Sequence, residues 1–195
     1  IALMDTWSKD ASERMKIKID QRVLTDILTD VAAANKGGTA GRISADLNIG
    51  VASTPVAITK ANAIDQIVNM GTVLDEANCP ESDRFIVIPA KMAGHIKLSD
   101  LKDASITGDG SSPLRNGRLG MIDRFTIYVS HNLYKSGSEF SILAGHKSGF
   151  TFASQMTNME TIRSETTFGN IIRGLQVYGY KVVKPEALAV GVITV

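Results

Sequence analysis

Cysteine, proline and aromatic residues are scarce in this sequence, and neither sign of charge dominates it. Cys79 is the only cysteine among 195 residues, which excludes an intrachain disulfide and a cysteine-based zinc cluster. The 21 basic residues are balanced by 20 acidic ones, so the composition gives no electrostatic footprint for nucleic acid. The apolar runs are far shorter than the roughly 20 residues of a membrane-spanning helix, and the first residues show no secretory signal pattern.

The residues that catalysis or metal binding would need are also sparse. His95, His131 and His146 fall on different predicted elements and lack the spacing of a metal site, so no metal or cofactor is expected. A glycine-rich stretch at 37–42 lacks the Gly-Lys-Ser/Thr ending of a phosphate-binding loop. Hydrophobic residues, in contrast, make up 44% of the chain, which is enough to form a core in one domain or in two small ones.

The first part of the chain has the periodicity of a long helix. Its apolar residues recur every three or four positions, on one helical face, and Gly37-Gly38 is a typical terminator. The pattern predicts one helix over about residues 5–35, roughly 45 Å long, whereas a compact globule of this chain length is roughly 40 Å across. We therefore expect a beam along an elongated subunit. The apolar face comprises Met4, Trp7, Ala11, Met15, Ile19, Val23, Ile27 and Val31.

A loop rich in small residues at 36–58 precedes a second helix, predicted over 60–77. Thr59 is positioned to cap this helix, and Pro80 prevents it from continuing. Residues 85–88 then form a short apolar run that is rich in β-branched side chains and closed by Pro89. Such a run predicts a central strand buried on both faces. The inner face of the second helix is expected to hold Ile64, Ile67, Val68 and Leu74.

Beyond residue 90 the pattern is mostly strand and turn. A short helix is predicted at 91–97, where Met92, His95 and Ile96 share one side, followed by a long polar loop at 100–116. Asn116-Gly117 signals a tight turn. Alternation of apolar and polar residues predicts half-buried strands. The predicted strands are 118–121, 125–130, 140–144, 150–153, 173–183 and 188–195, and the segment 159–168 is polar and alternating.

One set of short motifs suggests an enzyme. Ser99 and Lys102 match the S-x-x-K pattern of serine acyl-enzymes, and imperfect copies of their two other motifs follow at 130–132 and 147–149. The interval between the first two motifs is too short for the helical domain of those enzymes, and Ser99 leads into a loop instead of opening a helix. The acyl-enzyme is therefore a remote alternative.

Five stretches, in this order, resemble the major capsid proteins of tailed bacteriophages. The passage from 74–80 into 84–89 resembles that family's step from a helix to its central strand, and 116–120 with 125–133 resembles one of its hairpins. Three further stretches resemble a strand pair, a long strand and a closing phrase. They are Ala144-Gly145-His146-Lys147 with 150–153, Phe168-Gly169-Asn170 with 173–179, and Lys184-Pro185-Glu186-Ala187-Leu188-Ala189-Val190.

The resemblance implies an α+β shell fold with a long spine helix, a peripheral-domain sheet, and a central-axis domain whose mixed or antiparallel sheet is flanked by helices. The peripheral domain would take residues 1–58 and 154–185, with the spine helix at about 5–35 and a connecting loop. The central-axis domain would take residues 59–153 and 186–195.

The resemblance also implies a non-enzymatic structural subunit that self-assembles through pentamers and hexamers into an icosahedral phage head. The head would enclose double-stranded DNA without sequence-specific binding. Expected partners are other copies of the chain, with scaffolding and portal proteins during assembly, and no membrane. The expected location is the virion, after assembly in the cytoplasm of the bacterial host. An encapsulin-like shell subunit, which shares the fold, is the alternative.

The family also suggests which segments make contacts between subunits. An N-terminal arm and an extended loop precede the spine helix in that family, whereas three residues precede Met4 here. We therefore expect the chain as given to fold without building shells. In this fold a loop of the central-axis domain meets its symmetry mates at the five- or six-fold axis. The candidate residues for that loop are Asp103, Gly108, Asp109, Gly110, Arg115 and Asn116.

Overall fold

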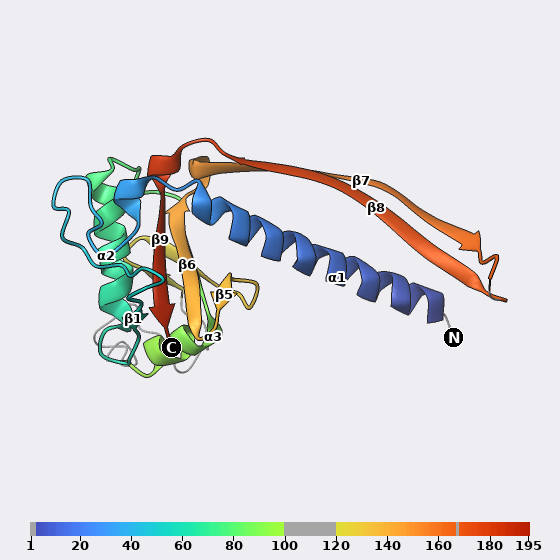
Figure 1. Ribbon diagram of the computed structural model, residues 1–195, viewed down its shortest axis with the longest axis horizontal. Helices are drawn as coiled ribbons and strands as arrows, with labels where there is room; N and C mark the ends of the chain where they lie inside the picture. Colours follow the sequence, from blue (N-terminus) through green and yellow to red (C-terminus); the bar gives the residue numbers. More distant parts are fainter. Residues whose placement is uncertain (1–2, 100–119, 167) are drawn as a thin grey trace.

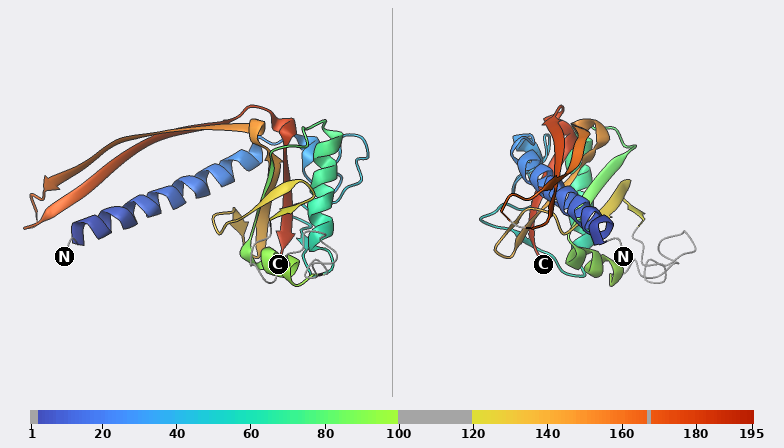
Figure 2. Two further views of the ribbon diagram at one scale, coloured as in Figure 1. Left: turned by 180° about the vertical axis from the view of Figure 1, so that it is seen from behind. Right: turned by 90° about the vertical axis from the view of Figure 1, so that its right-hand side faces the viewer.

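The subunit consists of a body built around a mixed sheet and an arm that projects from it. The computed structural model describes residues 3–99, 120–166 and 168–195. The arm contains helix α1, Leu3–Asp26, and the two-stranded ribbon of β7, Phe150–Arg163, and β8, Asn170–Val182. These elements leave the body on the same side and run outward together (Figures 1 and 2). The expectation of an elongated subunit with a beam is confirmed.

Helix α1 is shorter than its sequence pattern predicts. It ends at Asp26 rather than near residue 35, and the chain continues through two short 3₁₀ turns, Ile27–Thr29 and Ala33–Asn35. The reason lies in the body, because the Asn35 side chain donates to the backbone oxygens of Glu186 and Leu188 at 2.7 and 2.9 Å. A straight helix would carry Asn35 away from these acceptors. Tertiary contacts therefore override a local pattern that has no helix breaker before Gly37.

The apolar face of α1 is buried only near the body. Ile19, Val23 and Ile27 pack against Leu143 and Val190 of the sheet, in a cluster that also contains Val31 and Leu188. Toward the start of the helix the same face is open, and the Trp7 side chain is 66% exposed. The predicted apolar face is thus present, and within one subunit its burial begins at Ile19.

The packed part of α1 gives a direct test of this arrangement. Replacing Ile19 with alanine removes buried methyl and methylene groups from the cluster and should cost about 2–3 kcal/mol of unfolding free energy. Replacing the exposed Lys18 next to it should change that value by less than about 0.5 kcal/mol. Urea unfolding of both variants checks the prediction, and equal losses at the two positions would contradict the assigned orientation of the helix.

The sheet of the body has the order β1-β9-β6-β2-β4-β3, with β5 paired to β6. Strand β2, Arg84–Ile88, lies inside it, antiparallel to β6 and parallel to β4, which confirms the predicted central strand. Only alternate side chains of β2 are fully buried, because α2 covers one face while α1 covers part of the other. The strands are β1, Val56–Ala57; β3, Met121–Ile122; β4, Phe125–Val129; β5, Lys135–Ser136; β6, Glu139–His146; and β9, Leu188–Thr194.

Helix α2, Ala63–Glu76, supplies most of the core on the covered face. Ile67 and Leu74 are fully buried, as predicted, but Ile64 is only half-buried and Val68 is exposed. The buried stripe instead runs through Met70 and Val73, one step around the helix from the predicted face. Sequence periodicity indicates that a helix is amphipathic, but its exact rotation depends on the sheet beneath it.

The start of α2 also differs from the prediction. The Asn62 side chain accepts hydrogen bonds from the backbone nitrogen and the hydroxyl of Thr59, at 2.7 and 3.1 Å. Thr59 therefore ties down the approach to the helix, and its hydroxyl does not cap the helix. The shorter helix α3, Ala90–Lys97, follows β2 at the end of the sheet away from the arm (Figure 1). It buries Met92 and Ile96, and His95 is half-buried.

The ribbon is longer than the sequence pattern suggests. The predicted strand at 150–153 and the first part of the alternating segment, 159–163, belong to one strand, β7. Its pairing with β8 runs from Phe150 opposite Val182 to Arg163 opposite Asn170. A register shift between Met156 and Asn158 explains why the alternation changes phase within β7. The predicted strand at 173–183 is confirmed and begins earlier, at Asn170.

Candidate assembly surfaces

The six residues proposed for the capsomer-axis loop, Asp103, Gly108, Asp109, Gly110, Arg115 and Asn116, lie outside the described residues. Their nearest described neighbours are Ser99, which follows α3, and Gly120, which precedes β3. Helix α3 lies at the end of the sheet away from the arm (Figure 1). The placement of the axis loop remains a prediction.

The residues of the acyl-enzyme alternative have local partners. Ser99 is buried at the C-terminal end of α3, and its hydroxyl donates to the backbone oxygen of Ile96. The Ser130 hydroxyl accepts from the backbone nitrogen of Asn132, and the Lys147 ammonium pairs with Asp83 at 2.7 Å. Lys102 lies outside the described residues. These contacts do not support acyl transfer, because a nucleophilic serine needs an exposed hydroxyl beside a base.

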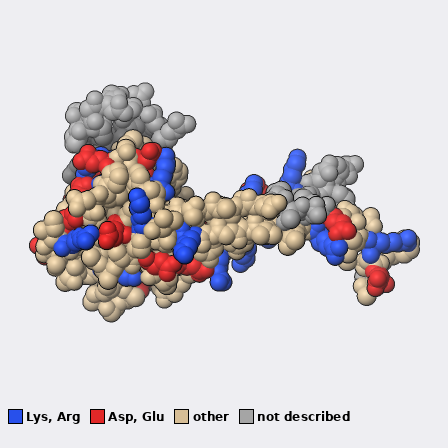
Figure 3. All heavy atoms as spheres, turned by 90° about the horizontal axis from the view of Figure 1, so that it is seen from above, with Lys and Arg blue, Asp and Glu red and all other residues tan. Residues whose placement is uncertain are grey.

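The ribbon presents an apolar row on its outer face. On the inner face, Tyr180 packs with α1, and Tyr178 lines a space beside it. Since side chains alternate along a strand, Ile171, Leu175 and Val177 lie on the opposite face, and all three are exposed. Arg173 shares this face and pairs with Glu160 of β7 at 2.7 Å. Seen from above, the arm next to the body shows a stretch of uncharged side chains bordered by Lys and Arg, and both signs of charge are present at the tip (Figure 3). Exposed apolar side chains grouped in this way make the outer face a candidate contact surface.

The tip of the ribbon carries an aromatic side chain in full contact with solvent. Phe168 is 100% exposed, and the Arg163 guanidinium lies 5.4 Å from the centre of its ring. A hydrogen bond from the Ser164 nitrogen to the Gly169 oxygen, 2.9 Å long, closes the turn. Exposed aromatic residues held in one orientation are frequent anchors of protein interfaces. The sequence pattern did not single out Phe168, because exposure at a hairpin tip depends on tertiary structure.

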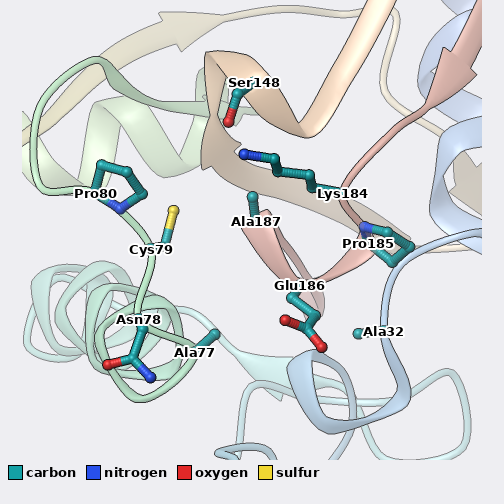
Figure 4. A pocket seen from close by; sticks show the side chains of 10 residues that line it. All are labelled: Ala32, Ala77, Asn78, Cys79, Pro80, Ser148, Lys184, Pro185, Glu186 and Ala187. Atoms are coloured by element: carbon teal, nitrogen blue, oxygen red, sulfur yellow. The ribbon is translucent and has the colours of Figure 1, made fainter.

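A cavity of about 470 Å³ lies where the arm joins the body. The Lys184 ammonium points toward Ser148 and the side of the cavity near Cys79, whereas the Glu186 carboxylate points away from the Lys184 ammonium (Figure 4). Burial raises the pKa of the Cys79 thiol, so this cysteine is protonated near neutral pH and is a poor nucleophile. In the described parts of the chain, no group of three or more His, Cys, Asp or Glu side chains is placed to hold a metal ion.

The end of α2 holds several segments of the body together through two neighbouring carboxylates. Asp75 contacts Arg84 of β2 and Arg124 of the β3–β4 turn, each at 2.7 Å. Glu76 accepts hydrogen bonds from the backbone nitrogens of Ile43 and Ser44, at 2.8 and 3.1 Å. Acidic residues are unfavourable at a helix C-terminus, but here each carboxylate faces donors. The C-terminal end of α2 is thus bound to the start of β2, to the β3–β4 turn and to the loop at residues 43–44.

The Glu76 contact predicts an acid-sensitive loop. Hydrogen bonds from Ile43 and then Ser44 lower the pKa of Glu76, so its stabilising effect is present above the unfolded pKa of about 4.3 and is lost as the pH falls through the lower folded value. Hydrogen exchange at Ile43 and Ser44, corrected for the intrinsic pH dependence, should show protection that disappears in acid. A Glu76→Gln variant should have less protection at neutral pH and no such acid transition. A transition of equal size in that variant would rule out Glu76 as its origin.

Comparison with known proteins adds independent information about the whole chain. A family model described as "Phage capsid protein" matches residues 1–191. No curated protein sequence matches closely enough to count as a relative. Among the described residues, no helix has both the length and the apolar character needed to cross a bilayer.

Solved structures share the fold. One from Mycobacterium phage Che8 has a TM-score of 0.70 at 25% identity, over 94% of this chain and 61% of that one. The capsid structure of cyanophage P-SCSP1u has a TM-score of 0.62 at 17% identity, over 97% of this chain and 65% of that one. The mature capsid of bacteriophage PhiM1 has a TM-score of 0.62 at 11% identity, over 97% and 64%. This chain thus spans less than two thirds of each of these chains.

Proposed function

This chain belongs to the phage capsid protein family, and we propose that it is the major capsid subunit, assembling through pentamers and hexamers into an icosahedral head that encloses double-stranded DNA. The observation that carries the proposal is the arm, whose outer apolar side chains Ile171, Leu175 and Val177 are 47–60% exposed and whose tip residue Phe168 is 100% exposed. A chain that functioned alone would gain stability by burying these side chains. A chain that assembles keeps them for contacts with other copies.

The division into domains follows the same proposal. Residues 1–58 and 154–185 form the peripheral domain with the spine helix, and residues 59–153 and 186–195 form the central-axis domain. The connecting loop rests on the body, where the backbone nitrogen of Val192 donates to the oxygen of Ile49 at 3.1 Å. The loop with Asp103, Gly108, Asp109, Gly110, Arg115 and Asn116 would meet its symmetry mates at the capsomer axis. One described flank, Ser99 after α3, lies at the end of the body away from the arm and supports this placement.

Partners other than the chain itself belong to the assembly pathway. Scaffolding and portal proteins would bind during assembly in the host cytoplasm, and DNA would be held without sequence recognition. The near balance of 21 basic and 20 acidic residues supports weak DNA contact, because strong binding to phosphates needs a clear excess of positive charge. An encapsulin-like shell would differ in enclosing protein cargo instead of DNA.

The proposal is tested by the association state of the purified chain. Native mass spectrometry and negative-stain microscopy over a concentration series should show self-association into rings of five or six or into closed particles. A monomer at every concentration, also with a crowding polymer present, would contradict the proposal. Particles containing protein cargo and no nuclease-protected DNA would instead favour the encapsulin-like alternative.

A pair of variants tests whether the outer face of the ribbon makes the contacts. Val177→Asp places a charge in the exposed apolar row and should weaken association at least tenfold, with little change in the melting temperature. Ser154→Asp is the matched control, since it also introduces aspartate into an exposed position of the ribbon but on the opposite face. Equal association of the two variants would show that the outer face is not the interface.

A further inference from the structure

The arm is held to the body at its base, but its two elements separate soon after leaving it. Phe150, Tyr180 and Val182 of the ribbon pack against the apolar cluster that contains Ile19 and Val23 of α1. Slightly farther out, a space of about 320 Å³ opens between them, lined by Arg14, Met15, Lys18, Ile19, Gln176 and Tyr178. In both side views the ribbon bows away from the helix beyond this point (Figures 1 and 2). The angle between helix and ribbon is therefore determined near the base.

A directional contact lies at that base. The Tyr180 hydroxyl donates to the Asp26 carboxylate, and the Arg22 guanidinium donates to the same carboxylate oxygen at 2.7 Å. Asp26 is the last residue of α1, and Tyr180 is near the end of β8. The contact thus joins residues 154 positions apart in the chain. Apolar packing alone tolerates small rotations, whereas a hydrogen bond to a carboxylate prefers a narrow range of angles.

The electrostatics keep this contact in place near neutral pH. The Tyr180 hydrogen bond lowers the pKa of Asp26, and Asp26 raises the pKa of Tyr180. The carboxylate is therefore ionised and the phenol protonated, which gives a charge-assisted hydrogen bond. Stacking of Tyr178 on Tyr180, with ring centres 6.3 Å apart, further restrains the Tyr180 ring.

We propose that the Tyr180–Asp26 hydrogen bond sets the angle between α1 and the ribbon, and that this angle determines the size of the assembled particle. The second part rests on the proposed function. Helix α1 has 24 residues, so the arm is about 36 Å long, and a change of about 10° at the base moves its far end by about 6 Å. The contact surfaces on the ribbon would move with it. In a closed assembly of identical subunits, the angle between contact surfaces decides how many copies close the shell.

The angle is measured first on the soluble subunit. Trp7 is the only tryptophan and lies near the start of α1, so it can act as an energy-transfer donor to a dansyl group on a cysteine introduced by Thr166→Cys at the ribbon tip. Cys79→Ala removes the native thiol. In this background, Tyr180→Phe keeps the ring but loses the hydroxyl that donates to Asp26. We expect one distribution of distances between Trp7 and the dansyl group in the parent protein, and a shifted or broader distribution in this variant. Asp26→Ala should change the distance distribution in the same way. The variant that carries both substitutions should show no larger change than either one alone, because both remove the same hydrogen bond.

The matched control is Tyr178→Phe. Tyr178 is a neighbouring tyrosine on the same face, and the described residues provide no hydrogen-bond partner for its hydroxyl. Its removal should leave the energy transfer unchanged. If Tyr180→Phe gives the same distribution as the wild-type residue, the angle is set by packing and the proposal is wrong.

Microscopy of assembled particles tests the second part. Assemblies of the wild-type and Tyr178→Phe chains, whether rings or closed particles, should have one diameter class, and Tyr180→Phe should lose it in favour of mixed diameters or open sheets. Particles of unchanged diameter, despite a changed angle in the energy-transfer measurement, would overturn the link to particle size. If the wild-type chain forms neither rings nor particles, the proposed function fails, while the energy-transfer result still decides whether Tyr180 sets the angle.

Discussion

Replacing Arg84 with alanine should lower the free energy of unfolding by about 3–5 kcal/mol, because it removes a charged group that is fully buried and paired. The Arg84 side chain is 0% exposed. It donates to the backbone oxygens of Pro80 and Cys79, at 2.8 and 2.7 Å, and contacts Asp75 at 2.7 Å. Alanine would leave these three acceptors without this donor and would open a cavity behind β2.

The design of the experiment separates burial from charge. Arg124 contacts the same Asp75 carboxylate, also at 2.7 Å, but its side chain is partly exposed. Arg124→Ala should therefore cost no more than about 1 kcal/mol. Arg84→Lys keeps the charge but cannot donate in the same fork, and its loss should fall between those of the two alanine variants. Urea unfolding at neutral pH measures all three, and an Arg84→Ala midpoint as high as that of Arg124→Ala would contradict the buried-pair argument.

The sequence predicts the strand that contains Arg84 but not the burial of the Arg84 side chain. The apolar run at 85–88 predicted the central strand correctly, because a strand inside a sheet needs β-branched and aromatic side chains on both faces. The same pattern gave no sign that the preceding arginine is fully buried. Its burial depends on the carbonyls of the turn at 79–80 and on a carboxylate nine positions earlier. Such three-dimensional partners leave no periodic signal in the sequence.

The burial of the apolar face of α1 also depends on partners that the sequence does not reveal. Its apolar face was predicted as a continuous stripe, and the stripe exists, but only Ile19 and the apolar residues after it are buried. A periodic pattern shows that a face is apolar, but not whether its cover comes from the same chain or from another copy. Trp7 and the exposed apolar side chains on the outer face of the ribbon are residues of this kind, because nothing in their pattern tells whether another copy covers them. In an assembling protein these exposed faces are where predictions of burial fail and where contacts are expected.

The candidate site was the least predictable part. The capsid fold could be predicted because phrases spread over the chain occur in a characteristic order, and the structural likeness confirms it. The contact surfaces of the arm depend on how far the ribbon extends and which way it faces. The register shift between Met156 and Asn158 interrupts the alternation of apolar and polar residues in β7. The sequence pattern therefore shows neither the full length of the ribbon nor which face points outward. Tyr180 and Asp26, which are 154 positions apart, could be paired only from the structure.

Replacing Gly50 with alanine should cost about 3–5 kcal/mol, through backbone strain and steric conflict together. Gly50 has φ of +90°, in the region that side chains disfavour, and a Cβ there would lie 2.0 Å from the backbone oxygen of Val192. That oxygen belongs to β9, whose Val192 nitrogen is bonded to Ile49, so neither segment can move without breaking the contact of the connecting loop with the sheet.

Gly94 supplies the matched control for this prediction. It lies within α3, and a Cβ there would meet nothing within 4 Å. Gly94→Ala should therefore stabilise the protein by up to about 1 kcal/mol, because alanine restricts the unfolded chain and favours the helix. Thermal melts of the two variants should shift in opposite directions. A Gly50→Ala melt at or above that of the wild-type protein would show that the connecting loop is not held against β9 in solution, and the docking of residues 36–58 on the body would then have to be abandoned.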